Sequence, residues 1–109
     1  MTRQRKPGYA AIAILKALKG GNRYGLDLMV ATDLPSGTVY PQLGRLEKRG
    51  LVQAEWESEE VARKEARPRR RYYKITESGN DTLNEAIADL RLLGATDDFT
   101  TPETALGDA

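Results

Sequence analysis

The apolar residues near the start of the chain recur at helical spacing. Four of them are separated by three or four positions: Ala11, Ile14, Leu15 and Leu18. Lysines 16 and 19 lie off this stripe. Such a pattern predicts an amphipathic helix over residues 9–19, which the following Gly20 ends.

A second and a third helix are predicted directly after the first. Asn22 is a suitable cap for the second, whose stripe consists of Tyr24, Leu28 and Ala31, and Pro35 marks its end. Ser36 is expected to cap the third helix, which runs to about residue 49 and stops at a glycine. The buried face of the third helix is formed by Val39, Leu43 and Leu46.

Two stretches with alternating apolar and polar residues follow the helices. The first contains Val52, Ala54 and Trp56, and the second contains Arg71, Tyr73 and Ile75. Alternation with period two is typical of half-buried strands, so we expect a hairpin whose inner side includes the tryptophan and the tyrosine. Residues 58–68 are polar or small and predict a long exposed hairpin tip without regular structure. The fold class is therefore mainly α with a two-stranded β wing, in winged helix-turn-helix order.

A last helix is predicted over residues 76–95, beginning with a turn at Thr76. It carries an apolar stripe formed by Leu83, Ile87, Leu90 and Leu93. Such a stripe needs a cover, either the first helix, a second copy of the chain, or both, and we assign it to dimerisation. The periodicity ends there, so the expected organisation is a body (1–75), a dimerisation helix (76–95) and a disordered acidic tail (96–109).

Composition excludes many functions. The chain has no cysteine and no histidine, which removes disulfides, zinc fingers, thiol nucleophiles and imidazole catalysis. An enzyme is therefore not expected, and neither is a metal or cofactor. There is no apolar run of membrane-spanning length and no secretory signal, so the expected location is the cytoplasm.

Charge is distributed unevenly along the chain. Residues 1–74 hold 16 Lys and Arg against 8 Asp and Glu, whereas residues 75–109 hold 1 against 8. The basic body indicates a polyanionic partner, although a solvated surface of uneven charge explains the same numbers.

The outer surface of the third helix is small and polar. Thr38 and Gln42 are placed to reach base edges, and Arg45 to bond guanine or phosphate. Helix N-terminal amides favour a phosphate nearby, although capping alone explains Ser36. The candidate DNA-binding residues of this helix are Ser36, Gly37, Thr38, Tyr40, Gln42, Arg45 and Lys48.

A basic run lies on the returning side of the hairpin. It consists of Arg67, Arg69, Arg70, Arg71 and Lys74. Guanidinium groups pair with phosphate oxygens and enter narrow minor grooves, so these residues are candidates for DNA binding. The alternative is a solvated charge run, or pairing with acids such as Glu57, which we expect mostly on the other side of the hairpin.

Several motifs resemble the signature of PadR-like transcriptional regulators. They are Tyr24-Gly25, Ser36-Gly37-Thr38-Val39-Tyr40-Pro41, Arg45-Leu46-Glu47, Arg49-Gly50-Leu51-Val52 and the block from Arg67 to Gly79. The resemblance implies a bacterial, dimeric winged-helix protein that binds DNA and usually represses transcription. It also implies that the third helix enters the major groove, that the wing contacts the flanking minor groove, and that the last helix pairs two subunits.

Three positions depart from that pattern. Gly44 stands where relatives often have a basic residue, Ala66 replaces a common glycine, and residues 76–109 lack the tryptophan that stacks drugs in some relatives. The expected function is a sequence-specific regulator of transcription, a repressor that binds a palindromic operator in double-stranded DNA as a homodimer, with a possible small-molecule effector. A protein-interaction module and a multidrug sensor are the alternatives.

Overall fold

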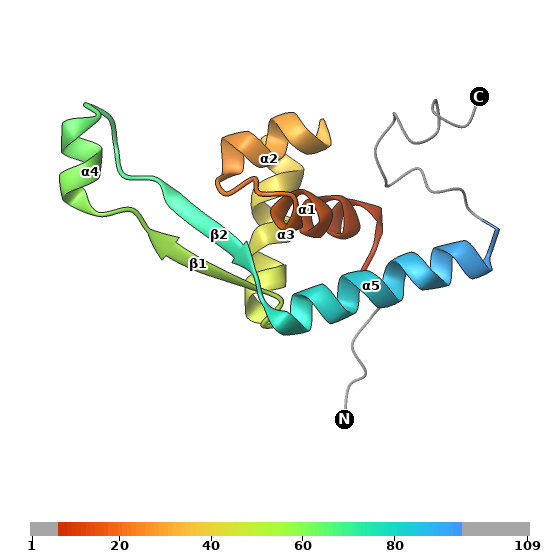
Figure 1. Cartoon of the computed structure of the whole chain (residues 1–109). Coiled ribbons are helices and arrows are strands. Elements are labelled where there is room, and N and C mark those ends of the chain that lie inside the picture. The colour runs from red at the N-terminus through yellow and green to blue at the C-terminus, as the bar shows by residue number, and fades with distance from the viewer. Residues whose placement is uncertain (1–6, 95–109) are drawn as a thin grey trace.

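The structure, a computed structural model, describes residues 7–94. Its elements are α1 (Tyr9–Lys19), α2 (Gly25–Thr32), α3 (Ser36–Lys48), β1 (Val52–Trp56), α4 (Glu59–Lys64), β2 (Arg71–Ile75) and α5 (Glu77–Leu92) (Figure 1). Helices α1 to α3 pack together, the hairpin extends away from them on one side, and α5 on the other. The predicted fold class is confirmed. The expected tail, residues 96–109, lies outside the described residues.

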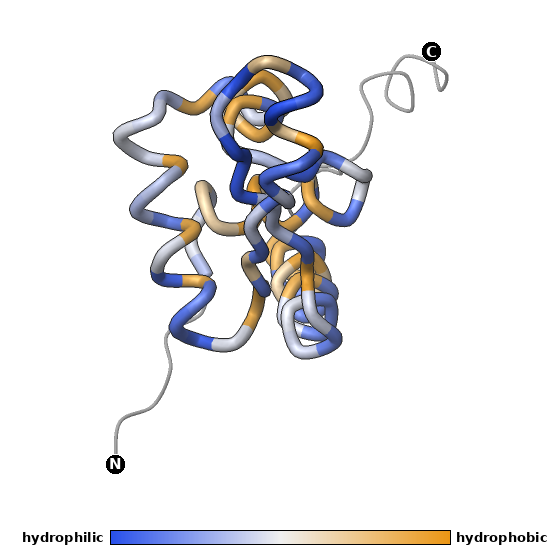
Figure 2. The backbone as a smooth tube through the Cα atoms, turned by 90° about the vertical axis from the view of Figure 1, so that its left-hand side faces the viewer, coloured by the Kyte–Doolittle hydropathy of each residue, from blue (hydrophilic) through white to orange (hydrophobic). Residues whose placement is uncertain are grey.

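The three-helix body holds the core. Its fully buried side chains are Ile14 and Leu15 of α1, Leu28 of α2, and Val39, Leu43 and Leu46 of α3. The apolar positions of α3 face the rest of the molecule and its polar positions face outward (Figure 2). The predicted face of α3 is confirmed, and its burial fixes which side of this helix meets solvent.

The two strands form an antiparallel hairpin. Val52 pairs with Ile75, Ala54 with Tyr73, and Trp56 with Arg71. On the far side of β2, the Tyr73 amide donates to the Arg23 carbonyl at 2.7 Å. The loop before α2 therefore continues the sheet and attaches the hairpin to the helices.

The predicted caps of α2 and α3 are wrong. Asn22 closes α1 instead, because its Nδ2 donates to the Ala17 carbonyl at 3.0 Å. Ser36 lies inside the first turn of α3, and the extended residue in front of that turn is Pro35. Ala31 is exposed, since the face of α2 that packs inward is centred on Gly25 and Leu28.

The hairpin tip contains a helix that the sequence pattern did not predict. Helix α4 is capped by Ser58, whose Oγ accepts from the Val61 amide at 3.2 Å. Acidic residues occupy its first turn and basic residues its last turn, as the helix dipole favours. Its Ala62 is buried. The expectation of an irregular tip failed because a helix of six residues makes fewer than two turns, too few for a repeating apolar pattern.

Helix α5 begins inside the core. The Thr76 hydroxyl accepts from the Gly79 amide at 3.0 Å, which confirms the predicted turn. Leu83 is only 1% exposed, because α5 packs on α1 at this point. Its assignment to a dimer interface is therefore wrong. Ile87 and Leu90 also pack partly against the core, whereas Leu93 is 83% exposed. No helix within residues 7–94 is long and apolar enough to span a membrane.

Candidate nucleic-acid interface

Helix α3 presents an open outer face. Gly37 and Gly44 lie there, and a Cβ atom added to either would meet no other atom within 4 Å. Pro41 is also exposed on this face, and the helix continues through it. Because no long side chain covers the backbone here, a partner can approach the helix closely.

Polar and basic side chains border this open face. Gln42 and Thr38 are half-buried, whereas Arg45 and Lys48 are exposed. Among the described residues, no carboxylate lies within ion-pair distance of Arg45 or Lys48. The neighbouring carboxylate of Glu47 is bound to Arg71 instead. The two cations are therefore available to an external anion.

Tyr40 joins α3 to α2. Its ring lies directly against Gly25, and a Cβ atom at position 25 would overlap the ring. The ring is 48% exposed, so one edge packs on α2 while the rest faces solvent beside α3. Gly25 thus sets the orientation of a tyrosine at the edge of the candidate interface.

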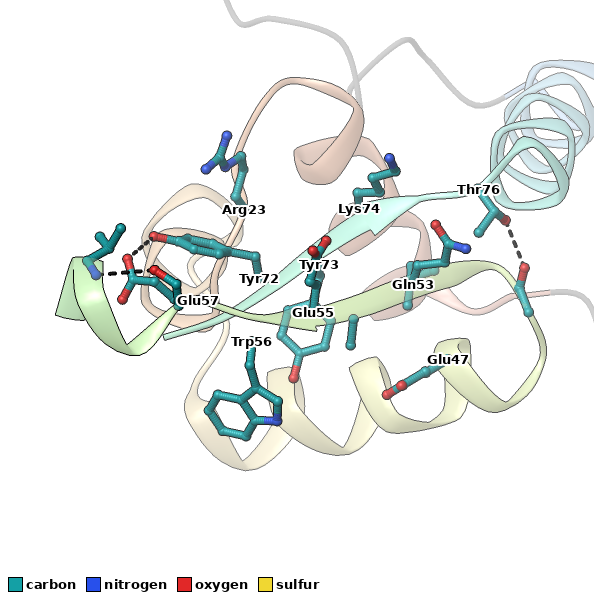
Figure 3. A pocket seen from close by; sticks show the side chains of 15 residues that line it. Arg23, Glu47, Gln53, Glu55, Trp56, Glu57, Tyr72, Tyr73, Lys74 and Thr76 are labelled. Carbon is teal, nitrogen blue, oxygen red and sulfur yellow. Dashed lines mark hydrogen bonds between the residues drawn. The ribbon is translucent and has the colours of Figure 1, made fainter. Parts of the chain in front are cut away.

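A buried carboxylate organises the wing. Glu57 is 6% exposed and receives two hydrogen bonds from Arg67, at 2.6 and 2.9 Å. The Tyr72 hydroxyl donates to it at 2.8 Å, as Figure 3 shows, and the Arg70 amide at 3.3 Å. The Arg67 hydrogen bonds are the main cause that lowers the pKa of Glu57 to about 2, against the opposing effect of burial. In turn, Glu57 raises the pKa of Arg67.

This network corrects the assignment of Arg67. Its side chain is 24% exposed and both terminal nitrogens bind Glu57, so it is an internal partner rather than a free phosphate ligand. The expectation that the acids lie on the other side of the hairpin is wrong for Glu57. Its amide donates to the Arg70 carbonyl at 2.8 Å, which places it opposite the arginine run.

Trp56 is not in the core, contrary to expectation. It is 53% exposed, although it lies on the same face of β1 as the buried Val52. The hairpin leads away from the helices toward its tip (Figure 1), and at this end of β1 about half of the indole is left open to solvent. Instead the guanidinium groups of Arg69 and Arg71 lie 5.6 and 5.2 Å from its ring centroid.

The structure divides the remaining basic residues between two faces of the hairpin. Arg71 lies on the α3 side, where it binds Glu47 at 3.2 Å. Arg70 lies over the Tyr24 ring at 4.1 Å. Lys74 is on the opposite side of the hairpin from Trp56 and Glu47 (Figure 3). The predicted wing residues therefore form two groups rather than one continuous patch.

Sequence reasoning missed one basic residue of this region. Arg23 lies 4.9 Å from the centroid of the Tyr72 ring, on the same side of the hairpin as Lys74 (Figure 3). It stands alone in a loop, without a basic neighbour or a periodic pattern. No sequence signal pointed to it.

Most of the described chain matches one family of known proteins. The sequence profile of the Transcriptional regulator PadR-like family matches residues 14–85. No curated protein matches the chain significantly. Among solved structures, a PadR family transcription regulator of hypervirulent Clostridium difficile is 27% identical, with a TM-score of 0.70 over 80% of this chain and 92% of that one.

Two further structures are similar. A PadR-like transcription factor of Bacteroides fragilis is 28% identical, with a TM-score of 0.65 over 91% of this chain and 88% of that one. BpsR of Bordetella bronchiseptica is 19% identical, with a TM-score of 0.68 over 97% of this chain and 76% of that one, and this likeness concerns the fold alone.

Proposed function

Because the chain belongs to the PadR-like family of transcriptional regulators, which bind DNA, we propose that α3 reads base edges in the major groove while the wing holds the backbone. Family membership makes the chain a regulator rather than an enzyme. The observation that carries the assignment of roles is the outer face of α3. Its bare glycines lie beside two cations that have no carboxylate partner in the described part of the chain.

In this proposal the residues of α3 differ in what they contact. Gln42 and Arg45 reach base edges, since both side chains offer paired hydrogen-bonding groups. Thr38 and Lys48 flank them, and Tyr40 borders the groove. Ser36 and Gly37, in the first turn, lie near a phosphate.

The wing residues supply backbone contacts. Arg69, Arg70 and Lys74 meet phosphates without reading sequence. Arg71 joins them once a phosphate competes with Glu47. Arg67 contributes indirectly, by holding the wing in shape through Glu57.

The two roles are separable by substitution. Replacing Gln42 or Arg45 with Ala is expected to cost roughly 1 to 3 kcal/mol on the preferred duplex, with less effect on random DNA. Replacing Arg70 or Lys74 with Ala is expected to weaken both duplexes alike and reduce the salt slope by about 1. Fluorescence anisotropy at several salt concentrations measures both effects.

A preferred duplex for this assay comes from selection out of random DNA. Lys19→Ala is the matched control, because this exposed lysine ends α1 outside the proposed interface, and it is expected to change neither quantity. If the Gln42 and Arg45 variants keep full discrimination while the wing variants lose it, the roles are reversed. If the wild-type chain binds acidic proteins but no duplex, the proposed function fails.

The finer proposal is a homodimeric repressor on a palindromic operator. Leu92 and Leu93 remain 84% and 83% exposed at the end of α5, an apolar end that a second copy would cover. Ile87 and Leu90 border this end, whereas Leu83 belongs to the core of one subunit.

Charged substitution at the end of α5 tests the dimer. Leu93→Glu is expected to yield monomers at micromolar concentration without loss of helical content, because the side chain contributes nothing to the monomer core. Sedimentation equilibrium measures the mass, and Glu85→Gln on the exposed face of α5 is the control. A variant that stays dimeric would place the interface elsewhere.

A small-molecule effector and a cytoplasmic location complete the proposal. The DNA binding of BpsR is regulated by 6-hydroxynicotinic acid, so a ligand is known to act on a protein of this fold. The cytoplasm is where a bacterial regulator meets its DNA.

A further inference from the structure

Trp56 is an exposed tryptophan at the boundary between the wing and α3. Its side chain lies on the α3 side of the hairpin, as does Glu47 of α3 (Figure 3). Half of its surface faces solvent. A large aromatic surface left open in this way is unfavourable for an isolated domain and is typical of a contact site.

Two arginines are held against this indole. The guanidinium group of Arg69 that lies near the indole also donates a hydrogen bond from its Nε to the Glu57 carbonyl at 2.8 Å, which orients it. Arg71 spans the gap to α3 through its 3.2 Å bond to Glu47. We call Trp56, Arg69 and Arg71 the indole clamp. The clamp therefore places the apolar surface of one indole next to two oriented cations.

The position of the clamp follows from how duplex DNA is built. A major groove and the neighbouring minor groove are separated by a single sugar–phosphate strand. If α3 occupies the major groove and the wing contacts the adjacent minor groove, that strand must pass between them. The clamp lies at this passage, because Arg71 connects the wing to α3.

We propose that the indole clamp binds this strand, with a deoxyribose packed against Trp56 and the flanking phosphates bound by Arg69 and Arg71. The inference rests on the proposed function and adds a residue to it. Both contacts are chemically suitable. A sugar presents C–H groups to an aromatic face, and each phosphate can accept two hydrogen bonds from one guanidinium group. When DNA binds, Arg71 would leave the Glu47 carboxylate and pair with a phosphate, so it has an anionic partner in both states.

The chain contains a single tryptophan, so its fluorescence reports on this site alone. Saturation of the full-length chain with duplex DNA is expected to reduce acrylamide quenching of Trp56 about threefold and to shift its emission to shorter wavelength. The matched control is the double variant Trp56→Phe, Tyr9→Trp. It moves the reporter to the exposed start of α1, where quenching is expected to stay unchanged.

Affinity gives the second measurement, by anisotropy of a labelled duplex. Trp56→Ala is expected to weaken preferred and random DNA about fivefold each and to leave the salt slope unchanged, because no charge is lost. Trp56→Phe, which retains an aromatic face, is expected to weaken binding by no more than about twofold. Arg71→Ala, in contrast, is expected to lower the salt slope by about 1.

The outcomes separate this inference from the proposed function. If the labelled duplex binds while acrylamide reaches Trp56 as easily as before, the clamp is wrong and the proposed function stands. Equal protection of the reporter at position 9 would show general shielding and would also overturn the clamp. If no duplex binds at all, both proposals fail.

Discussion

Replacement of Gly79 with alanine is expected to destabilise the protein by about 3 kcal/mol, the upper range for forcing an extra methyl group into packed structure. A Cβ atom at this position would overlap the Leu51 carbonyl and crowd Ile75. The carbonyl is backbone and cannot turn aside. The first turn of α5 must therefore move away from the loop before β1, although Leu83 anchors the same helix in the core.

Gly44→Ala is the matched control, for which we expect a gain in stability instead of a loss. Position 44 is helical and its added Cβ would meet no atom within 4 Å, so alanine is expected to stabilise α3 by about 1 kcal/mol. Urea unfolding followed by circular dichroism measures both changes. An unfolding free energy that falls by less than 1 kcal/mol in Gly79→Ala would contradict the tight contact described here.

The second large effect is expected from Glu57→Ala. This change removes the carboxylate that accepts from Arg67 and from the Tyr72 hydroxyl, two half-buried donors. The wing tip should loosen while the helices stay folded. Amide exchange in α4 and β2 should rise, and duplex affinity should fall about tenfold, equivalent to ~1.4 kcal/mol of binding free energy.

The pH dependence of the wing provides an independent check. Glu57 has a pKa of about 2 in the folded chain, below its ordinary 4.5, so its ion pair stabilises fully above pH 4.5. This stabilisation is expected to be lost as the pH falls from about 4.5 to 2, and to be constant at neutral pH. Glu57→Gln should abolish that acid-dependent component, and Glu59→Gln, on exposed α4, should retain it. Equal acid responses in both variants would contradict the role of Glu57.

The sequence was sufficient where a long helix had a clear apolar face. Val39, Leu43 and Leu46 recur with helical spacing and are all buried, so the buried face of α3 was predicted correctly. Thr38 and Gln42, expected on its outer surface, are half-buried. The order of helices and strands followed from similar patterns, because burial of one face is what creates the pattern. The role of each polar side chain on α3 stays a prediction.

The pattern failed where the chain leaves the core. At the end of β1, alternation placed Trp56 inside and Glu57 outside, and the structure has the reverse. Alternation of apolar and polar residues along a strand shows which residues share one face of the sheet. It does not show whether other parts of the protein cover that face. Glu57 is buried by its bonds to Arg67 and Tyr72, which are 10 and 15 residues away, and no local spacing encodes such contacts.

The last helix raised a different ambiguity. Its apolar stripe fits intramolecular packing and dimer contact equally well, since both remove the same surface from water. Only the three-dimensional arrangement shows that Leu83 and Ala86 pack within one subunit and that Leu93 does not. The sequence pattern left both covers open; the structure shows the intramolecular one for Leu83 and Ala86, and dimer contact by Leu93 stays a prediction.

The burial of Leu83 attaches α5 firmly to the helical body. The helix is anchored in the same core as α1, and α1 packs on α3. In a dimer joined at the far end of α5, the two copies of α3 would stand at a fixed separation and a fixed rotation about the DNA axis. Because duplex DNA turns once in about 10 base pairs, such a dimer would bind only pairs of half-sites whose spacing matches this separation.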